Sequence, residues 1–245
     1  MTIIDGKKAA ATLREELKKK IRELKSTYNT VPGLTVILVG EDPASKIYVK
    51  NKEKFANEVG IKSEVVRYPE NIEEKVVLNK IKELNDNNKV SGILVQLPLP
   101  KHIDKRKVIE AINPNKDVDG LHPMNVGNLS SGYESNISCT PLGCYLLIKN
   151  IEKNLSGKHA VIIGRSNLNG KPMAQLLLKE NCTVTITHSK TKNLKTECSR
   201  ADIIIAAVGK PKLVKADWVK KDAIVIDVGI NKTDSGLVGD VDFDE

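Results

Sequence analysis

The sequence predicts an α/β protein of two domains. Short runs rich in valine and isoleucine alternate with amphipathic stretches along most of the chain. This pattern is typical of βαβ units whose parallel sheets are covered on both faces. The alternation is interrupted once, at residues 113–138, where asparagine, glycine, serine and proline accumulate. We therefore expect one domain over residues 1–138, a second over 139–245, and a cleft near their junction, where small-molecule sites usually form.

The first group of elements precedes this interruption. The charged N-terminal stretch has a helical period. Apolar runs bounded by polar residues, glycine or proline then predict strands at 34–39, 63–68 and 92–96. Apolar residues at helical spacing predict helices at 46–59 and 72–85.

The second group starts afresh after the interruption. A helix at 142–151 is expected to connect the two domains, and a further helix is expected at 171–179. The same type of apolar run predicts four more strands, at 160–163, 183–187, 203–207 and 223–228.

The composition is that of an ordinary soluble protein. The 245 residues are 40% hydrophobic and 29% charged, and no apolar run is long enough for a membrane span. The N-terminus carries charges and a helical period where a secretory signal would have its apolar core. A cytoplasmic location is expected.

Charge and cysteine content make two classes of function less favoured. Aromatic residues make up only 3% of the chain and the lysines are spread over nearly every predicted helix, so the net charge of +8 favours an anionic small ligand over nucleic acid. The four cysteines contain no C-x-x-C pair and there are only four histidines, so we expect reduced, mostly structural cysteines and no metal site.

A candidate cofactor turn lies in VIIGRSNLNGKPMAQLLLK. Gly164 ends a strand, Gly170 opens a helix, and Pro172 stands where a first-turn proline is tolerated. The segment is neither a G-x-G-x-x-G fingerprint, a P-loop nor a nucleophile elbow. Its helix start would still offer free N–H groups and a positive dipole to a pyrophosphate.

The next strand favours NADP over NAD. It should end near His188 and Ser189, where NAD-binding folds place an acidic residue on the ribose 2′-hydroxyl. No acid stands there, and Lys190 together with Arg165 favours an added 2′-phosphate. The alternative is that Arg165 and Lys190 are ordinary surface charges.

Two later strands end in a small residue plus glycine, in ADIIIAAVGKP and AIVIDVGIN. Such ends let the backbone approach a ligand at the carboxyl edge of a sheet. Asp227 in the second segment is interpreted as a structural loop cap.

Candidate catalytic groups lie in the first half. Ser45, Tyr48 and Lys52 share one face of a predicted helix, which sets an amine beside a phenol. The alternative is that Tyr48 and Lys52 simply pack on the helix surface. Short-chain dehydrogenases also have a Tyr-x-x-x-Lys pair, but there it follows the cofactor turn, so the reversed order here argues against that family. Gln96 ends a buried strand, and its neutral amide would orient Lys52 yet leave it free to exchange a proton.

Two carboxylates, Asp117 and Asp119, lie in the expected interdomain loop. They are either ligand-binding groups or turn formers.

In this order, the motifs closely resemble the methylenetetrahydrofolate dehydrogenase/cyclohydrolase family over essentially the whole chain. The segments that carry the resemblance are SKIYVKNK, GILVQLPLP, PNKDVDGLHP, CTPLG, VIIGRSNLNGKP, THSKT, ADIIIAAVGKP, AIVIDVGIN and GDVDF. The resemblance implies a homodimeric, bifunctional enzyme of one-carbon metabolism. It would oxidise 5,10-methylenetetrahydrofolate with NADP and hydrolyse the methenyl product to 10-formyltetrahydrofolate.

The resemblance also implies a role for each candidate residue. Lys52 would be the central acid/base, supported by Gln96. Tyr48 would pack on the substrate, and Asp119 would hold the pterin through its two acceptor oxygens. The NADP contacts would be Gly164, Arg165, Ser166, Ser189 and Ile230. The N-terminal domain would then be the catalytic, folate-binding domain, and the C-terminal one a Rossmann-like NADP-binding domain.

Two departures from the family pattern are visible. Family members usually continue past GDVDF with a glycine-rich PGGVGP segment and a last helix that returns to the first domain, whereas this sequence stops at Glu245. We expect closure and full activity to depend on that segment. Asn169 replaces a more usual apolar residue, which should not abolish cofactor binding.

Three other readings stay open at this point. Another NADP-dependent α/β oxidoreductase would share the cofactor half but need neither Gln96 nor Asp119. A basic nucleic-acid-binding protein would show steep salt dependence and no response to NADP. A folate-binding protein without catalysis is the third.

Overall fold

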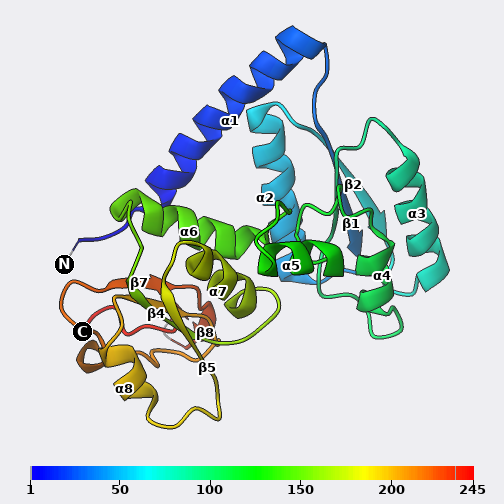
Figure 1. Cartoon of the computed structure of the whole chain (residues 1–245). Coiled ribbons are helices and arrows are strands. Elements are labelled where there is room, and N and C mark those ends of the chain that lie inside the picture. The colour runs from blue at the N-terminus through cyan, green and yellow to red at the C-terminus, as the bar shows by residue number, and fades with distance from the viewer. Residues whose placement is uncertain (1, 235) are drawn as a thin grey trace. The chain divides into compact units, whose positions relative to one another are not determined.

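The computed structural model describes residues 2–234 and 236–245. The chain forms two compact units, residues 1–125 and 126–245, and each has a parallel sheet with helices packed on it (Figure 1). The α/β fold class is therefore confirmed. The boundary between the units falls within α5 (Pro123–Ser130).

The first unit is built on three parallel strands in the order β2-β1-β3. The strands are β1 (Gly33–Val39), β2 (Lys62–Tyr68) and β3 (Gly92–Val95). Successive residues of β1 point to opposite faces, and both sets are buried, because helices cover both sides of the sheet.

Three helices cover the faces of this sheet. They are α2 (Pro43–Val59), α3 (Glu74–Asp86) and α4 (Lys105–Ala111). One face, with Ile37 and Val39 of β1, packs against α3 and α4. The opposite face, with Val36 and Leu38, packs against Val49 of α2. The covering of both faces explains why β1 and β3 are nearly continuous apolar runs.

Helix α2 has clear start and stop signals. The Asp42 carboxylate accepts the N–H of Ser45 at 2.8 Å, Pro43 lies in the first turn, and Gly60 ends the helix in the left-handed region with φ of 94°. The preceding helix α1 (Gly6–Tyr28) contacts α2.

The second unit is built on four parallel strands in the order β5-β4-β6-β7. The strands are β4 (His159–Ile163), β5 (Thr183–Thr187), β6 (Ile203–Ala206) and β7 (Ile224–Asp227). The other elements are α6 (Cys139–Ile151), α7 (Gly170–Lys179), α8 (Leu194–Ser199), the 3₁₀ turn η1 (Ala216–Trp218) and a hairpin of β8 (Asn231–Thr233) with β9 (Gly236–Val238). Helix α7 packs on β4, β5 and α6.

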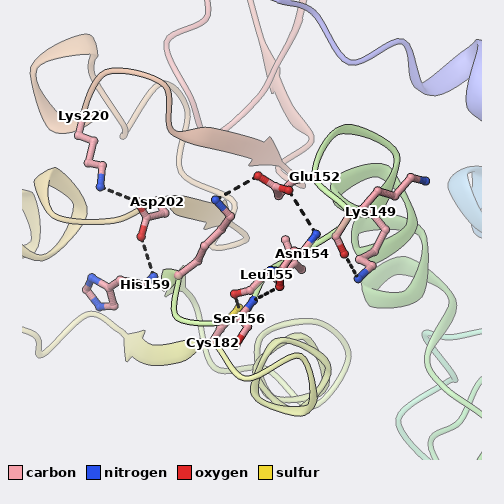
Figure 2. A network of polar contacts seen from close by, with 11 residues as sticks. Lys149, Glu152, Asn154, Leu155, Ser156, His159, Cys182, Asp202 and Lys220 are labelled. Atoms are coloured by element: carbon pink, nitrogen blue, oxygen red, sulfur yellow. Dashed lines mark hydrogen bonds and ion pairs between the residues drawn. The ribbon is translucent and has the colours of Figure 1, made fainter.

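A polar network closes the amino-terminal edge of this sheet (Figure 2). Asp202, just before β6, accepts the backbone N–H of His159 at 2.8 Å and an N–H of Lys220 at 2.5 Å. The buried Cys182 thiol donates to the Leu155 carbonyl at 3.3 Å. These groups lie at the edge opposite the carboxyl ends of the strands, so we interpret the network as structural.

All seven expected strands are present, with ends shifted by no more than one residue. Two expectations were wrong. The interrupted segment 113–138 contains α5, which forms despite its asparagine and glycine content. Helix α6 lies wholly in the second unit, so α5, and not the helix expected at 142–151, carries the chain across the boundary.

The four cysteines are free, and three of them are buried. Within the described residues, no helix has the length and apolar character needed to cross a membrane.

Candidate active site

The first candidate site lies on α2. Ser45 is buried in the first turn of the helix, Tyr48 is 47% exposed, and Lys52 follows one turn later, half-buried. Because the α2 N-terminus is capped by Asp42, the start of the helix is fixed and the spacing of three and four residues sets these side chains along one side.

Lys52 contacts the first residue beyond β3. Its Nζ donates to Oε1 of Gln96 at 3.1 Å, and the Gln96 amide nitrogen donates to the Leu97 carbonyl at 2.7 Å. The second bond fixes the orientation of the amide, so that its oxygen faces the amine. The pairing expected from the sequence is present, and it joins a helix to the carboxyl edge of the sheet.

The positive charge of Lys52 acts on the Asp119 carboxyl. Burial raises the pKa of the Asp119 carboxyl, the charge of Asp117 raises it further, and Lys52 opposes both effects. A partly buried carboxyl beside an amine can accept hydrogen bonds from the polar edge of a ligand, or exchange a proton with it.

The neighbouring Asp117 has a structural role. It is 2% exposed and accepts the backbone N–H of His122 at 2.8 Å and the Asn125 amide at 2.9 Å. Asn125, itself buried, also donates to the Pro114 carbonyl at 2.9 Å. These bonds hold together the segment that contains Asp119. Of the two aspartates, Asp117 is therefore the turn former.

The second candidate site begins at the turn from β4 to α7. Gly164 has φ of 123°, and a Cβ there would lie 2.5 Å from the Ala207 carbonyl oxygen. A Cβ on Gly170 would overlap the carbonyl oxygen of Gly164. Both positions therefore require glycine, because the backbone of the turn packs directly against neighbouring backbone there.

Four exposed candidate residues follow strand ends in the second unit. Arg165 and Ser166 are exposed, and the Ser166 hydroxyl accepts the N–H of Asn169 at 3.1 Å. Ser189 is exposed just beyond β5, and Ile230 is 70% exposed just beyond β7. All these residues follow the carboxyl ends of parallel strands, so they share one edge of the sheet.

Asp227 caps a loop, as interpreted from the sequence. Its carboxylate accepts the backbone N–H groups of Gly229 at 3.0 Å, Asp240 at 2.8 Å and Val241 at 3.1 Å. Sequence reasoning missed Asp240, a fully buried carboxylate at the same edge of the sheet. Its partners are backbone groups about thirty residues away, so only the glycine before it and the acidic GDVD run could have drawn attention to it.

In the described part of the chain, no group of histidine, cysteine or acidic side chains is placed to hold a metal ion. The two sites therefore offer an amine, an amide, a phenol and a carboxyl in the first unit, and a glycine-lined helix start in the second.

Comparison with known proteins matches each half of the chain to a family model. Residues 4–119 match the catalytic domain of tetrahydrofolate dehydrogenase/cyclohydrolase, and residues 138–245 match its NAD(P)-binding domain.

Relatives match over nearly the whole chain. The bifunctional protein FolD of Pelagibacter ubique is 76% identical over 245 residues, covering 100% of this chain and 87% of the relative. The crystal structure of the bifunctional enzyme FolD from Campylobacter jejuni is 51% identical with a TM-score of 0.97, covering 100% of this chain and 87% of that one. The Trypanosoma brucei dehydrogenase-cyclohydrolase, solved with NADP cofactor and inhibitor, is 35% identical with a TM-score of 0.92, covering 99% and 86%.

Proposed function

Because the chain belongs to the tetrahydrofolate dehydrogenase/cyclohydrolase family, we propose that it oxidises 5,10-methylenetetrahydrofolate with NADP and hydrolyses the methenyl product to 10-formyltetrahydrofolate. The observation that carries the proposal is the contact of Lys52 with Gln96, beside Asp119. An amine held by a neutral amide and flanked by a carboxyl suits proton transfer on a polar heterocycle.

The second unit fits a dinucleotide. The close turn at Gly164 and Gly170 leads into α7, whose first backbone N–H groups and positive dipole would suit a pyrophosphate. Arg165 and Ser189 would hold the 2′-phosphate, since no acidic residue follows β5, and Gly164, Ser166 and Ile230 would complete the site. When bound, NADP accepts the hydride that leaves the bridging carbon between N5 and N10.

Loss of that hydride leaves a delocalised N–C–N cation on the folate, which is an electrophile for water. Lys52 then moves the protons that allow the five-membered ring to open. The Gln96 amide holds the amine without fixing a proton on it, whereas a carboxylate in that place would stabilise the ammonium form. Holding acid/base and substrate together in one site lets both steps proceed without release of the intermediate.

Substrate orientation falls to Tyr48 and Asp119. The exposed phenol ring of Tyr48 would pack against the folate. Asp119 would accept hydrogen bonds from the donor edge formed by the ring N–H and exocyclic amine of the pterin.

Three further assignments are carried over from the sequence: two rest on the family resemblance, and the location rests on the charged N-terminus. We propose that residues 1–138 form the folate-binding catalytic domain and 139–245 the NADP-binding domain. We also propose that the protein is a homodimer and acts in the cytoplasm.

The test is a coupled spectroscopic assay. The purified protein is mixed with methylenetetrahydrofolate and either NADP or NAD, and reduced cofactor and methenyl absorbance are followed together. We expect NADPH to form and the methenyl signal to decay faster than in a protein-free control. Folded protein that gave no turnover with either cofactor would contradict the proposal.

A further inference from the structure

A buried carboxylate outside the proposed contact residues binds the loops at the cofactor edge of the second unit. Asp240 is 0% exposed. Its Oδ2 accepts the backbone N–H groups of Val208 at 2.7 Å and Gly209 at 3.0 Å. Its Oδ1 accepts the N–H of Lys210 at 2.8 Å and the amide of Asn231 at 2.9 Å. Four donors therefore satisfy both oxygens, which explains how a charge can be buried there.

These donors come from two different loops. Val208, Gly209 and Lys210 follow β6, whereas Asn231 begins β8, after β7. Asp240 therefore ties together the backbone beyond two neighbouring strands of the sheet.

Asp227 extends the same network. It accepts the backbone N–H of Asp240 at 2.8 Å and that of Gly229 at 3.0 Å. A Cβ on Gly229 would overlap the Asp240 carboxylate, and a Cβ on Gly239 would overlap that of Asp227. Glycine at both positions is thus required for the two carboxylates to reach their donors.

These hydrogen bonds hold the residues on either side of Ile230. The backbone N–H of Gly229, the residue before it, donates to Asp227, and the side-chain amide of Asn231, the residue after it, donates to Asp240. Ile230 itself is 70% exposed. An exposed apolar side chain between one neighbour held through its backbone and another held through its side chain can pack against a ligand with a smaller loss of loop entropy on binding.

We propose that Asp240 is a positioning residue for NADP, acting through Ile230 and the loop after β6. The proposal rests on the function proposed above, and it deepens the account of the cofactor site. Asparagine in place of Asp240 would have one acceptor oxygen instead of two, so two of the four N–H donors would lose their partner. Small displacements of both loops should follow, and displacements of this kind weaken binding and catalysis without unfolding a domain.

The experiment compares Asp240→Asn with the unaltered chain in three measurements: the Kd for NADP by calorimetry, the KM for NADP in the dehydrogenase reaction, and cyclohydrolase turnover of added methenyltetrahydrofolate. The hydrolytic reaction consumes no NADP, so it measures the amount of folded, active protein. We expect Kd and KM for NADP to rise at least about tenfold while cyclohydrolase kcat stays within about twofold.

The matched control is Asp202→Asn, which removes a carboxylate from the opposite edge of the same sheet. It should lower stability and leave Kd for NADP unchanged. If Asp240→Asn does not fold, Asn231→Ala removes only one of the four donors and should raise Kd about threefold.

The outcomes separate the two claims. If the unaltered chain bound no NADP, the proposed function would fail, and this proposal with it. If the unaltered chain bound NADP and both Asp240→Asn and Asn231→Ala bound it equally tightly, or if Asp202→Asn weakened binding as much as Asp240→Asn, only the positioning role would be overturned.

Discussion

At the scale of single residues, the neutral partner of Lys52 is the most informative feature. Gln96 accepts from the amine at 3.1 Å and is itself fixed by the Leu97 carbonyl. We propose that an amide at this position, in place of a carboxylate, allows the lysine to act as both acid and base.

We predict that Gln96→Glu impairs hydrolysis more than it impairs stability. A carboxylate at the Gln96 position would hold Lys52 in its protonated form, so cyclohydrolase kcat should fall about 100-fold at neutral pH. A pH–rate profile measures the effect. Gln175→Glu, at the chain's other glutamine, is the control and should retain full turnover. A Gln96→Glu enzyme with an unchanged profile would contradict the role given to Lys52.

Asp119 predicts a pH dependence of substrate binding. Burial raises its pKa, so the ionised, accepting form is lost at a higher pH than for an ordinary aspartate as the solution is acidified. The KM for folate should therefore rise as pH falls through that raised pKa. Asp119→Asn should raise KM about tenfold near neutral pH and remove this dependence. Steady-state kinetics at a series of pH values from neutral downward test it.

The same raised pKa has a cost in stability. The unfolded chain releases the Asp119 proton at a lower pH than the native protein does. The contribution of Asp119 to the free energy of unfolding therefore decreases as pH rises from the usual aspartate range through the raised pKa. Asp119→Asn should consequently increase the free energy of unfolding at neutral pH, as measured by urea denaturation. A loss of stability there would show that the ionised carboxyl is well solvated or paired.

At the scale of elements, the turn between β4 and α7 depends on glycine. Gly164→Ala would set a Cβ 2.5 Å from the Ala207 carbonyl oxygen at φ of 123°. We expect KM for NADP to rise at least about tenfold, with cyclohydrolase activity retained. Gly143→Ala, in open space on α6, is the matched control and should not change cofactor binding. Equal behaviour of the two variants would exclude a close backbone approach at Gly164.

The predictability of each element follows from its side chains. The buried strands could be located because both faces of the sheet are covered there, which makes β1, β3, β4 and β6 runs of apolar residues. The edge strands β2 and β5 still carry valine or isoleucine between turn residues. Helix α5 was missed because its asparagines and glycine are typical of loops, and Asn125 is held there by tertiary bonds to Pro114 and Asp117. The short hairpin of β8 and β9 has no apolar alternation to reveal it.

The same division holds for the sites. Tyr48 and Lys52 are four residues apart on one helix, so their proximity follows from helical geometry. Gln96 could be added because strand ends gather at one edge of the sheet. Asp240 could not, since its role depends on backbone donors about thirty residues earlier that no local pattern announces.

At the scale of the whole molecule, the four cysteines report on the native fold. Cys139 is exposed, whereas Cys144, Cys182 and Cys198 are buried. Burial raises the pKa of the Cys144 and Cys198 thiols to about 11 in each case, so neither forms thiolate at neutral pH.

We therefore predict that a thiol reagent at pH 8, near an ordinary cysteine pKa, labels one cysteine quickly and the other three only after denaturation. Mass spectrometry of the labelled peptides identifies the site, and Cys139→Ser should abolish the fast phase. Rapid native labelling of Cys144 or Cys198 would show that the core of the second unit opens more readily than its packing indicates.

The distribution of the chemical groups between the two units has a consequence for inheritance. Lys52, Gln96 and Asp119 all belong to the first unit, while the glycine turn and the carboxylates at 227 and 240 belong to the second. On the proposed assignments, mutations that alter the choice of electron acceptor therefore arise in one stretch of the gene, and those that alter proton transfer arise in another. Selection can retune either stretch separately, and descendants of one ancestor can change cofactor while keeping their hydrolytic centre.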